Sequence, residues 1–164
     1  MKFEVRILGS GAATPTLERN PTSQYVYVNE RHFLIDCGEG TQIQLRKYKV
    51  KFQKIDHIFI SHLHGDHYLG LMGYLSSLHL LGRTKPITVY GPEGLKELIL
   101  IQLKLSKSYL SYEIHFEIIK TDSKTLILED AIVEVYAFPL NHRIETYGYL
   151  IQEKKRLPNM KKEV

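Results

Sequence analysis

One short stretch of sequence decides what this chain can be, namely Ser61-His62-Leu63-His64-Gly65-Asp66-His67. It follows an apolar run typical of a buried strand, and residues two apart in an extended segment share a face. His62 and His64 can therefore point at one metal ion together. Gly65 lets the backbone turn sharply, which aims Asp66 and His67 at a second position nearby. Imidazole nitrogen with carboxylate oxygen is a ligand set typical of zinc.

The competing interpretation is that these are ordinary turn or surface histidines. For a single histidine that interpretation would usually be the better one. Here three histidines and one aspartate fall within six residues at a strand-to-helix corner, and so dense a set favours a metal site. Two ions close together could activate a water at neutral pH and clamp a phosphoryl oxygen, which indicates a two-metal hydrolase.

Two further residues are candidates for the same site. His142 lies just past a predicted strand that ends at Phe138, and a loop after a strand is where a distant ligand is expected. Alone it would be an ordinary loop histidine, but beside the first cluster it is a candidate third imidazole. Asp36 ends a buried strand, where its carboxylate could hydrogen-bond a ligand histidine, cap the following turn, or do both. The other histidines and the lone cysteine are expected to be structural or surface residues: His32, Cys37, His57, His79 and His115.

Strand and helix patterns fill the rest of the chain. Short or alternating apolar runs predict strands near residues 3–7, 24–28, 32–35, 57–60, 87–90, 114–119, 126–128, 132–138 and from 148, with a hairpin turn at 29–31. Apolar residues at helical spacing predict helices at 41–48, with Thr41 as N-cap, at 68–81, ended by Gly82, and at 93–105. The order is not a strict alternation, so we expect a mixed α/β layered domain with the sheet inside.

Composition limits the number of domains, the kind of partner and the location of the protein. A chain of 164 residues, 43% of them hydrophobic, suits one domain with a real core. The net charge of +4 is compatible with a polyanionic partner without requiring one. A single cysteine excludes an internal disulfide, and no apolar run approaches the roughly 20 residues that span a bilayer, so we expect a soluble cytoplasmic protein. Residues 153–164 are charged and are expected to form a mobile tail after a domain over 1–152.

These residues together resemble the metallo-β-lactamase superfamily, whose signature is His-x-His-x-Asp-His after a strand. Within it, the chain resembles the ribonuclease Z family of transfer-RNA 3′-end-processing endonucleases. The matching segments run in order from about Lys2 to Glu153 and comprise residues 8–15, the loop 15–20, Asp36-Cys37-Gly38-Glu39-Gly40-Thr41-Gln42, the histidine motif, Val89-Tyr90-Gly91-Pro92, and His142 with Tyr147-Gly148-Tyr149.

The resemblance implies an αββα sandwich and two zinc ions. By position, His62, His64 and His142 would hold one ion, and Asp66 and His67 the other, with Asp66 also accepting the proton of the attacking water. The substrate would be precursor transfer RNA. Its acceptor end would meet the loop that contains three family positions, Pro15, Arg19 and Asn20. Leu17 departs from the Lys that is usual in this loop, so by the resemblance one phosphate contact of the family is not expected here.

The family's second half is absent from this sequence, including a bridging Asp and a further ligand His. The chain therefore resembles the N-terminal half, with the start of a substrate-binding arm at its charged tail. We expect the second ion to bind weakly or not at all. An apolar sheet face and an unpaired strand edge should be exposed. By resemblance a homodimer is expected, with contacts at residues 68–81 and at the helix after Thr41.

Two alternatives stay open at this point. The same histidine motif serves other hydrolases of this fold, including general phosphodiesterases, because fold does not fix function. A chain without the second-half ligands could instead be a non-catalytic binding or dimerisation fragment.

Overall fold

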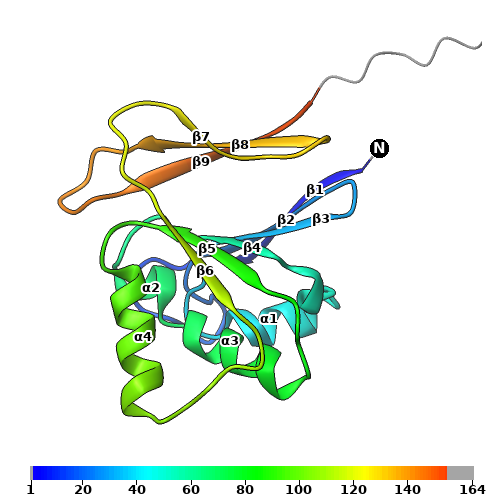
Figure 1. Cartoon of the computed structure of the whole chain (residues 1–164), viewed down its shortest axis with the longest axis vertical. Helices are drawn as coiled ribbons and strands as arrows, with labels where there is room; N and C mark the ends of the chain where they lie inside the picture. The colour runs from blue at the N-terminus through cyan, green and yellow to red at the C-terminus, as the bar shows by residue number, and fades with distance from the viewer. Residues whose placement is uncertain (1, 155–164) are drawn as a thin grey trace, which may run out of the picture.

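The computed structural model describes residues 2–154 and contains two β-sheets with helices on one side. Figure 1 shows three layers, with the smaller sheet above, the larger sheet in the middle and the helices below. The elements are β1 (Phe3–Gly9), β2 (Ser23–Val28), β3 (Arg31–Ile35), α1 (Thr41–Lys47), the 3-10 helix η1 (Phe52–Lys54), β4 (His57–Phe59), α2 (Gly65–Tyr68), α3 (Leu71–Leu80), β5 (Ile87–Gly91), α4 (Leu95–Leu105), β6 (Ile114–Ile118), β7 (Thr125–Glu129), β8 (Val133–Pro139) and β9 (Tyr147–Glu153).

The larger sheet has the order β1-β2-β3-β4-β5-β6. Its first three strands are antiparallel, and the turn between β2 and β3 places Asn29 and Glu30 at φ 44° and 68°, as a tight hairpin turn requires. Strands β3 to β6 are parallel, so each connection must cross back over the sheet, and the helices supply these crossovers. The carboxyl ends of β3, β4 and β5 therefore meet at one edge.

Two separate cores hold the layers together. The helices pack on one face of the larger sheet through fully buried side chains such as Leu45, Tyr74 and Leu75. The smaller antiparallel sheet, in the order β7-β8-β9, packs on the other face through Val133 and Val135. The expected metallo-β-lactamase-type layering is confirmed for α, β and β, and no helix among residues 2–154 covers the outer face of the smaller sheet.

Two local predictions about the starts of helices were wrong. The helix expected over 68–81 is present as α3 but begins only at Leu71, because the backbone just before it bonds to a neighbouring loop. Gly70 N–H donates to Cys37 O at 2.9 Å, and a Cβ on Gly70 would lie 2.0 Å from Gly38 O. Thr41 is not the N-cap of α1. That position belongs to Gly40, at φ 78°, and the Thr41 hydroxyl donates to Gly38 O at 2.7 Å.

The exposed apolar sheet face that the sequence predicts is present on β1. Phe3, Val5 and Ile7 are about half exposed, although they lie on the face where their partner strand buries Val26 and Val28 under the smaller sheet. The three-stranded sheet does not reach far enough to cover β1. Strand β9 extends through Glu153, one residue beyond the expected domain boundary, and the rest of the expected tail, 155–164, lies outside the described residues. None of the helices within 2–154 combines the length and apolar character needed to cross a bilayer.

Candidate metal centre

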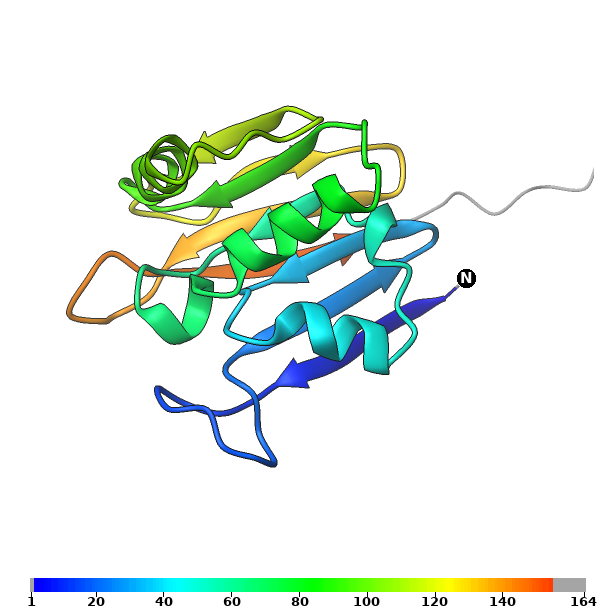
Figure 2. The same ribbon diagram turned by 90° about the horizontal axis from the view of Figure 1, so that it is seen from below.

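The histidine motif lies at the edge where the parallel strands end. The loop after β4 carries His62 and His64, and the loop between β8 and β9 carries His142. Figure 2 shows that α2 and the β8–β9 loop reach the same side of the molecule. The two loops meet although nearly eighty residues separate them, because the smaller sheet folds back across the larger one.

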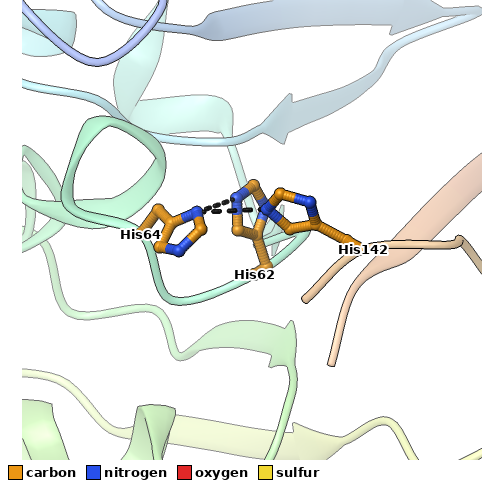
Figure 3. Close-up of side chains that lie close together, drawn as sticks. All are labelled: His62, His64 and His142. Atoms are coloured by element: carbon orange, nitrogen blue, oxygen red, sulfur yellow. Dashed lines mark hydrogen bonds between the residues drawn. The ribbon is translucent and has the colours of Figure 1, made fainter. Parts of the chain in front are cut away.

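Three imidazole nitrogens converge at this edge (Figure 3). His62 Nε2 lies 3.0 Å from His64 Nδ1, and His142 Nε2 lies 3.3 Å from the same atom. All three candidate ligand atoms are within 4.8 Å of one another. Nitrogens bound tetrahedrally to zinc at about 2.0–2.1 Å would lie roughly 3.3 Å apart, so the arrangement fits one zinc-sized ion with little movement.

The hydrogen bonds around His62 place its hydrogen on Nδ1 and leave Nε2, the nitrogen that faces the other two histidines, without a hydrogen. The Ser61 hydroxyl donates to Asp36 Oδ2 at 3.0 Å, so its oxygen accepts from His62 Nδ1–H, also at 3.0 Å. Nε2 of His62 then keeps a lone pair for a metal. Burial, followed by the neighbouring charges of His67 and His64, lowers the pKa of His62 to about 4, so the ring is neutral at physiological pH.

A second position lies beside the first. Asp66 Oδ2 and His67 Nε2 are 3.5 Å apart, and the rings of His62 and His67 have centroids 3.9 Å apart. For His67, burial lowers the pKa, but the hydrogen bond and charge of Asp36 outweigh burial and raise it. For Asp66, burial raises the pKa, but the hydrogen bond from the Ala13 backbone and the charge of His67 outweigh it and lower the pKa. Within residues 2–154, only the first position gathers three ligands.

Asp36 lies behind the histidines and accepts hydrogen bonds from two residues of the motif. Its Oδ1 accepts from Ser61 N–H at 2.8 Å, and its Oδ2 accepts from His67 Nδ1–H at 2.8 Å. The bond to His67 directs the free Nε2 of that ring toward the second position. Asp36 has φ 55°, a left-handed conformation that Asp tolerates better than most residues, and its backbone N–H donates to Phe59 O at 2.8 Å.

Sequence reasoning missed two side chains that contact the site. Ser61 connects Asp36 to His62, and its position inside the quoted motif could have revealed this. Arg143 places Nη2 3.1 Å and Nε 3.3 Å from His64 Nε2. Its place directly after His142 was the available signal, because a guanidinium beside a metal centre is suited to bind phosphate.

The loop with Pro15, Arg19 and Asn20 touches the site through its backbone. Ala13 N–H donates to Asp66 Oδ2 at 2.8 Å. Asn20 does not present a free side chain, since its carbonyl accepts from the Gln44 amide of α1. The side chain of Leu17 is fully exposed.

Several solved structures share this fold. One is the metallo-β-lactamase fold protein YhfI from Bacillus subtilis, whose sequence is 20% identical to this chain. The two structures superpose with a TM-score of 0.68 over 90% of this chain and 56% of YhfI. The fold and the converging histidines thus define a protein of the metallo-β-lactamase fold. More narrowly, the model of the family described as anti-Pycsar protein Apyc1 matches residues 3–155, and the chain belongs to that family.

The resemblance to ribonuclease Z is confirmed by named relatives. Ribonuclease Z of Bacteroides thetaiotaomicron is 48% identical over 96% of this chain and 50% of its own length. Ribonuclease Z of Parabacteroides distasonis is 42% identical over 99% of this chain and 53% of its own length. The structure of the short form of human tRNase Z has a TM-score of 0.84 and 36% identity, covering 92% of this chain and 64% of that one. The chain therefore spans about half the length of the curated relatives it matches.

Proposed function

We propose that this chain carries the zinc-binding part of a ribonuclease Z, an endoribonuclease that removes the 3′ trailer from precursor transfer RNA. The observation that supports this most strongly is the convergence of His62, His64 and His142, with Asp66 and His67 beside them, in a chain so similar to proteins named ribonuclease Z. Cytoplasmic location and homodimerisation belong to the same proposal. In this view the domain includes all of β9, which ends at Glu153, and the charged residues after it begin a substrate-binding arm.

The protein's own residues have distinct roles in this proposal. His62 and His142 would hold one zinc ion through Nε2, and His64 would hold it through Nδ1. His67 and Asp66 would contribute to a second zinc site. A zinc ion held by these residues would lower the pKa of a bound water and polarise a phosphoryl oxygen. Asp66 accepts the proton of the attacking water, and the low pKa of its carboxyl keeps it ionised for this role.

Arg143 is the residue that we assign to the phosphate of the substrate. Its guanidinium can donate to His64 Nε2 only while that nitrogen carries no hydrogen. When His64 uses Nδ1 as a ligand, the hydrogen of the neutral ring is on Nε2, and Arg143 can no longer donate there. The guanidinium is then available to a phosphate beside the ions. Pro15, Arg19 and Asn20 would position the acceptor end of the RNA on the loop joined to Asp66.

A second candidate is a general phosphodiesterase of the same fold, because fold does not fix the substrate. It would keep the site and act on a phosphodiester other than transfer RNA. A non-catalytic binding module is the remaining alternative.

The first experiment is the zinc content of the purified chain by mass spectrometry, with His62→Ala and the exposed His115→Ala as a matched pair. Zinc near one equivalent in the wild type and in His115→Ala, but not in His62→Ala, is the expected result. Absence of zinc from all three would contradict the proposed first site. Cleavage of precursor transfer RNA and of bis-p-nitrophenyl phosphate then separates the candidates. Hydrolysis of the small diester without RNA cleavage favours the second candidate, and binding without cleavage of either favours the third.

A further inference from the structure

The first candidate metal position joins two layers of the fold. Its ligands His62 and His64 follow β4 in the larger sheet, whereas His142 comes from the loop between β8 and β9 in the smaller sheet (Figure 3). The two sheets pack on each other through apolar side chains, and such packing is non-directional. Metal ligands, however, must be placed to within about 0.5 Å. A directional contact is therefore needed to fix the β8–β9 loop on the larger sheet.

The loop does not supply that contact from its own tip. The side chain of His142 is exposed, and within residues 2–154 the side chains of His142 and Arg143 hydrogen-bond to His64 alone. The loop is closed at its base, where Leu140 N–H donates to Thr146 O at 2.9 Å. The place of His142 therefore follows from where the start of β9 lies on the larger sheet.

Two hydrogen bonds join the start of β9 to the segment that leads into His62. Tyr147 N–H donates to Ser61 O at 2.9 Å, and the Tyr149 hydroxyl donates to Ile60 O at 2.7 Å. Two consecutive carbonyls directly before His62 thus accept from alternate residues of one strand in the other sheet. These bonds have direction and length, so they fix β9 along the segment that carries two of the three ligands.

A proline explains why the Ile60 carbonyl is open to a side chain. Ile60 is fully buried, and its N–H donates to Tyr90 O at 2.8 Å in the ladder between β4 and β5. In a parallel ladder the residue two positions further along the neighbouring strand donates back, and here that residue is Pro92, which has no N–H. A buried carbonyl without a donor is costly, and the Tyr149 hydroxyl supplies the donor.

Tyr149 is held so that its hydroxyl stays in place. Its ring packs against the fully buried Phe59, with the ring centroids 5.1 Å apart. In the smaller sheet Tyr149 lies opposite Ala137, which is also fully buried. Burial raises the pKa of Tyr149 well above its ordinary value, so the hydroxyl keeps the hydrogen that it donates.

We propose that Tyr149 is a positioning residue for the metal centre, which sets the place of His142 through its hydrogen bond to the Ile60 carbonyl. Tyr149 does not touch the ion and acts through the start of β9. Without the hydroxyl, β9 can shift along the apolar contact, and the exposed His142 moves away from His62 and His64. The inference rests on the proposed zinc ligands and does not depend on which phosphodiester is the substrate.

Removal of one hydroxyl tests the proposal while the ring and its packing remain. Tyr149→Phe should weaken zinc binding about tenfold in a competition titration, and Tyr112→Phe by less than about twofold. Tyr112 is the matched control because its hydroxyl also donates to a backbone carbonyl, Leu75 O at 2.7 Å, but in the core on the other face of the larger sheet. A loss of general stability would affect both variants alike.

Two further measurements separate positioning from a merely structural role. His142→Ala should cost less zinc affinity in the Tyr149→Phe protein than in the wild type, because the ring is already displaced there, whereas independent effects would add. In the metal-free protein, hydrogen exchange of the Tyr147 amide should become about fivefold faster in Tyr149→Phe and stay unchanged in Tyr112→Phe.

The outcomes distinguish this inference from the proposed function. Zinc in the wild type with equal affinity in Tyr149→Phe overturns the inference alone, and so does an equal loss of affinity in Tyr112→Phe. Additive effects of Tyr149→Phe and His142→Ala, or unchanged exchange of the Tyr147 amide, overturn it as well. A wild type that binds no zinc refutes the proposed zinc site and the inference together.

Discussion

Asp36→Asn should change the hydrogen bonds of the candidate metal centre while leaving its shape unchanged. Asn has the same size as Asp and also tolerates the left-handed conformation at φ 55°. Its oxygen can still accept from Ser61 N–H. Its amide NH2, however, then replaces Oδ2 and faces two donors, the Ser61 hydroxyl and His67 Nδ1–H.

Both rings must respond by moving a hydrogen. His67 can accept from the new amide only if its hydrogen moves from Nδ1 to Nε2, the nitrogen that faces the second position. Ser61 must also accept from the amide, so its hydroxyl turns toward His62 Nδ1, and the hydrogen of His62 moves to Nε2. In the metal-free protein, Nε2 of His62 and Nε2 of His67 would then each carry a hydrogen, which a metal ion must displace.

The magnitude follows from the two charged hydrogen bonds that Asp36 Oδ2 accepts, one from His67 and one from the Ser61 hydroxyl that orients His62. Such a bond contributes about 1.5–3 kcal/mol, and each 1.4 kcal/mol is about tenfold in affinity. We expect zinc binding to weaken by about tenfold to a hundredfold, the range typical of residues that orient metal ligands. Competition titration against a chromogenic chelator measures this, with the exposed Asp122→Asn as control. An affinity within about twofold of the wild type would show that Asp36 does not set the hydrogen positions.

Three further predictions concern folding and the phosphate contact. Gly70→Ala should lower the free energy of unfolding by about 3 kcal/mol in a urea titration, because the new Cβ would collide with the Gly38 carbonyl. Gly82→Ala, where the Cβ meets open space but φ is 77°, should lower it by only about 1 kcal/mol, and equal losses in the two variants would refute the collision. The free energy of unfolding of the metal-free protein should fall by about 1–2 kcal/mol as the pH drops from 6.5 to about 4, because the unfolded chain binds a proton on His62 that the folded chain does not. A His62→Asn variant with the same pH profile would contradict this. Arg143→Met should leave zinc content unchanged and reduce phosphodiester hydrolysis about a hundredfold, and equal hydrolysis would remove Arg143 from the phosphate site.

Local periodicity was sufficient to predict most elements and the shared direction of His62 and His64. The two-residue spacing of His62 and His64 fixes their shared direction because it depends only on extended backbone. His142 could be found because a ligand far along the chain is expected where a strand ends. The order of strands could not be read from periodicity, and the sandwich came from the resemblance.

Features that depend on contacts between distant segments could not be predicted in the same way. The break between α2 and α3 depends on Gly70 approaching Gly38, and nothing in the helical pattern of 68–81 indicates it. Thr41 is a good capping residue by type, but the left-handed Gly40 occupies that position. The hydrogen positions on His62 and His67 follow from Ser61 and Asp36 meeting across the strands β3 and β4, which only the folded chain shows.

Asp36 also affects how the two candidate metal positions move relative to each other. His67 bonds to this carboxylate directly, and His62 bonds to it through Ser61, so both rings share one support. Rings held by separate supports would fluctuate independently, and the gap between their ligand nitrogens would vary with both motions. With a common support, a displacement of Asp36 carries both rings in the same direction. The spacing between the two positions should therefore be steadier than the location of either one.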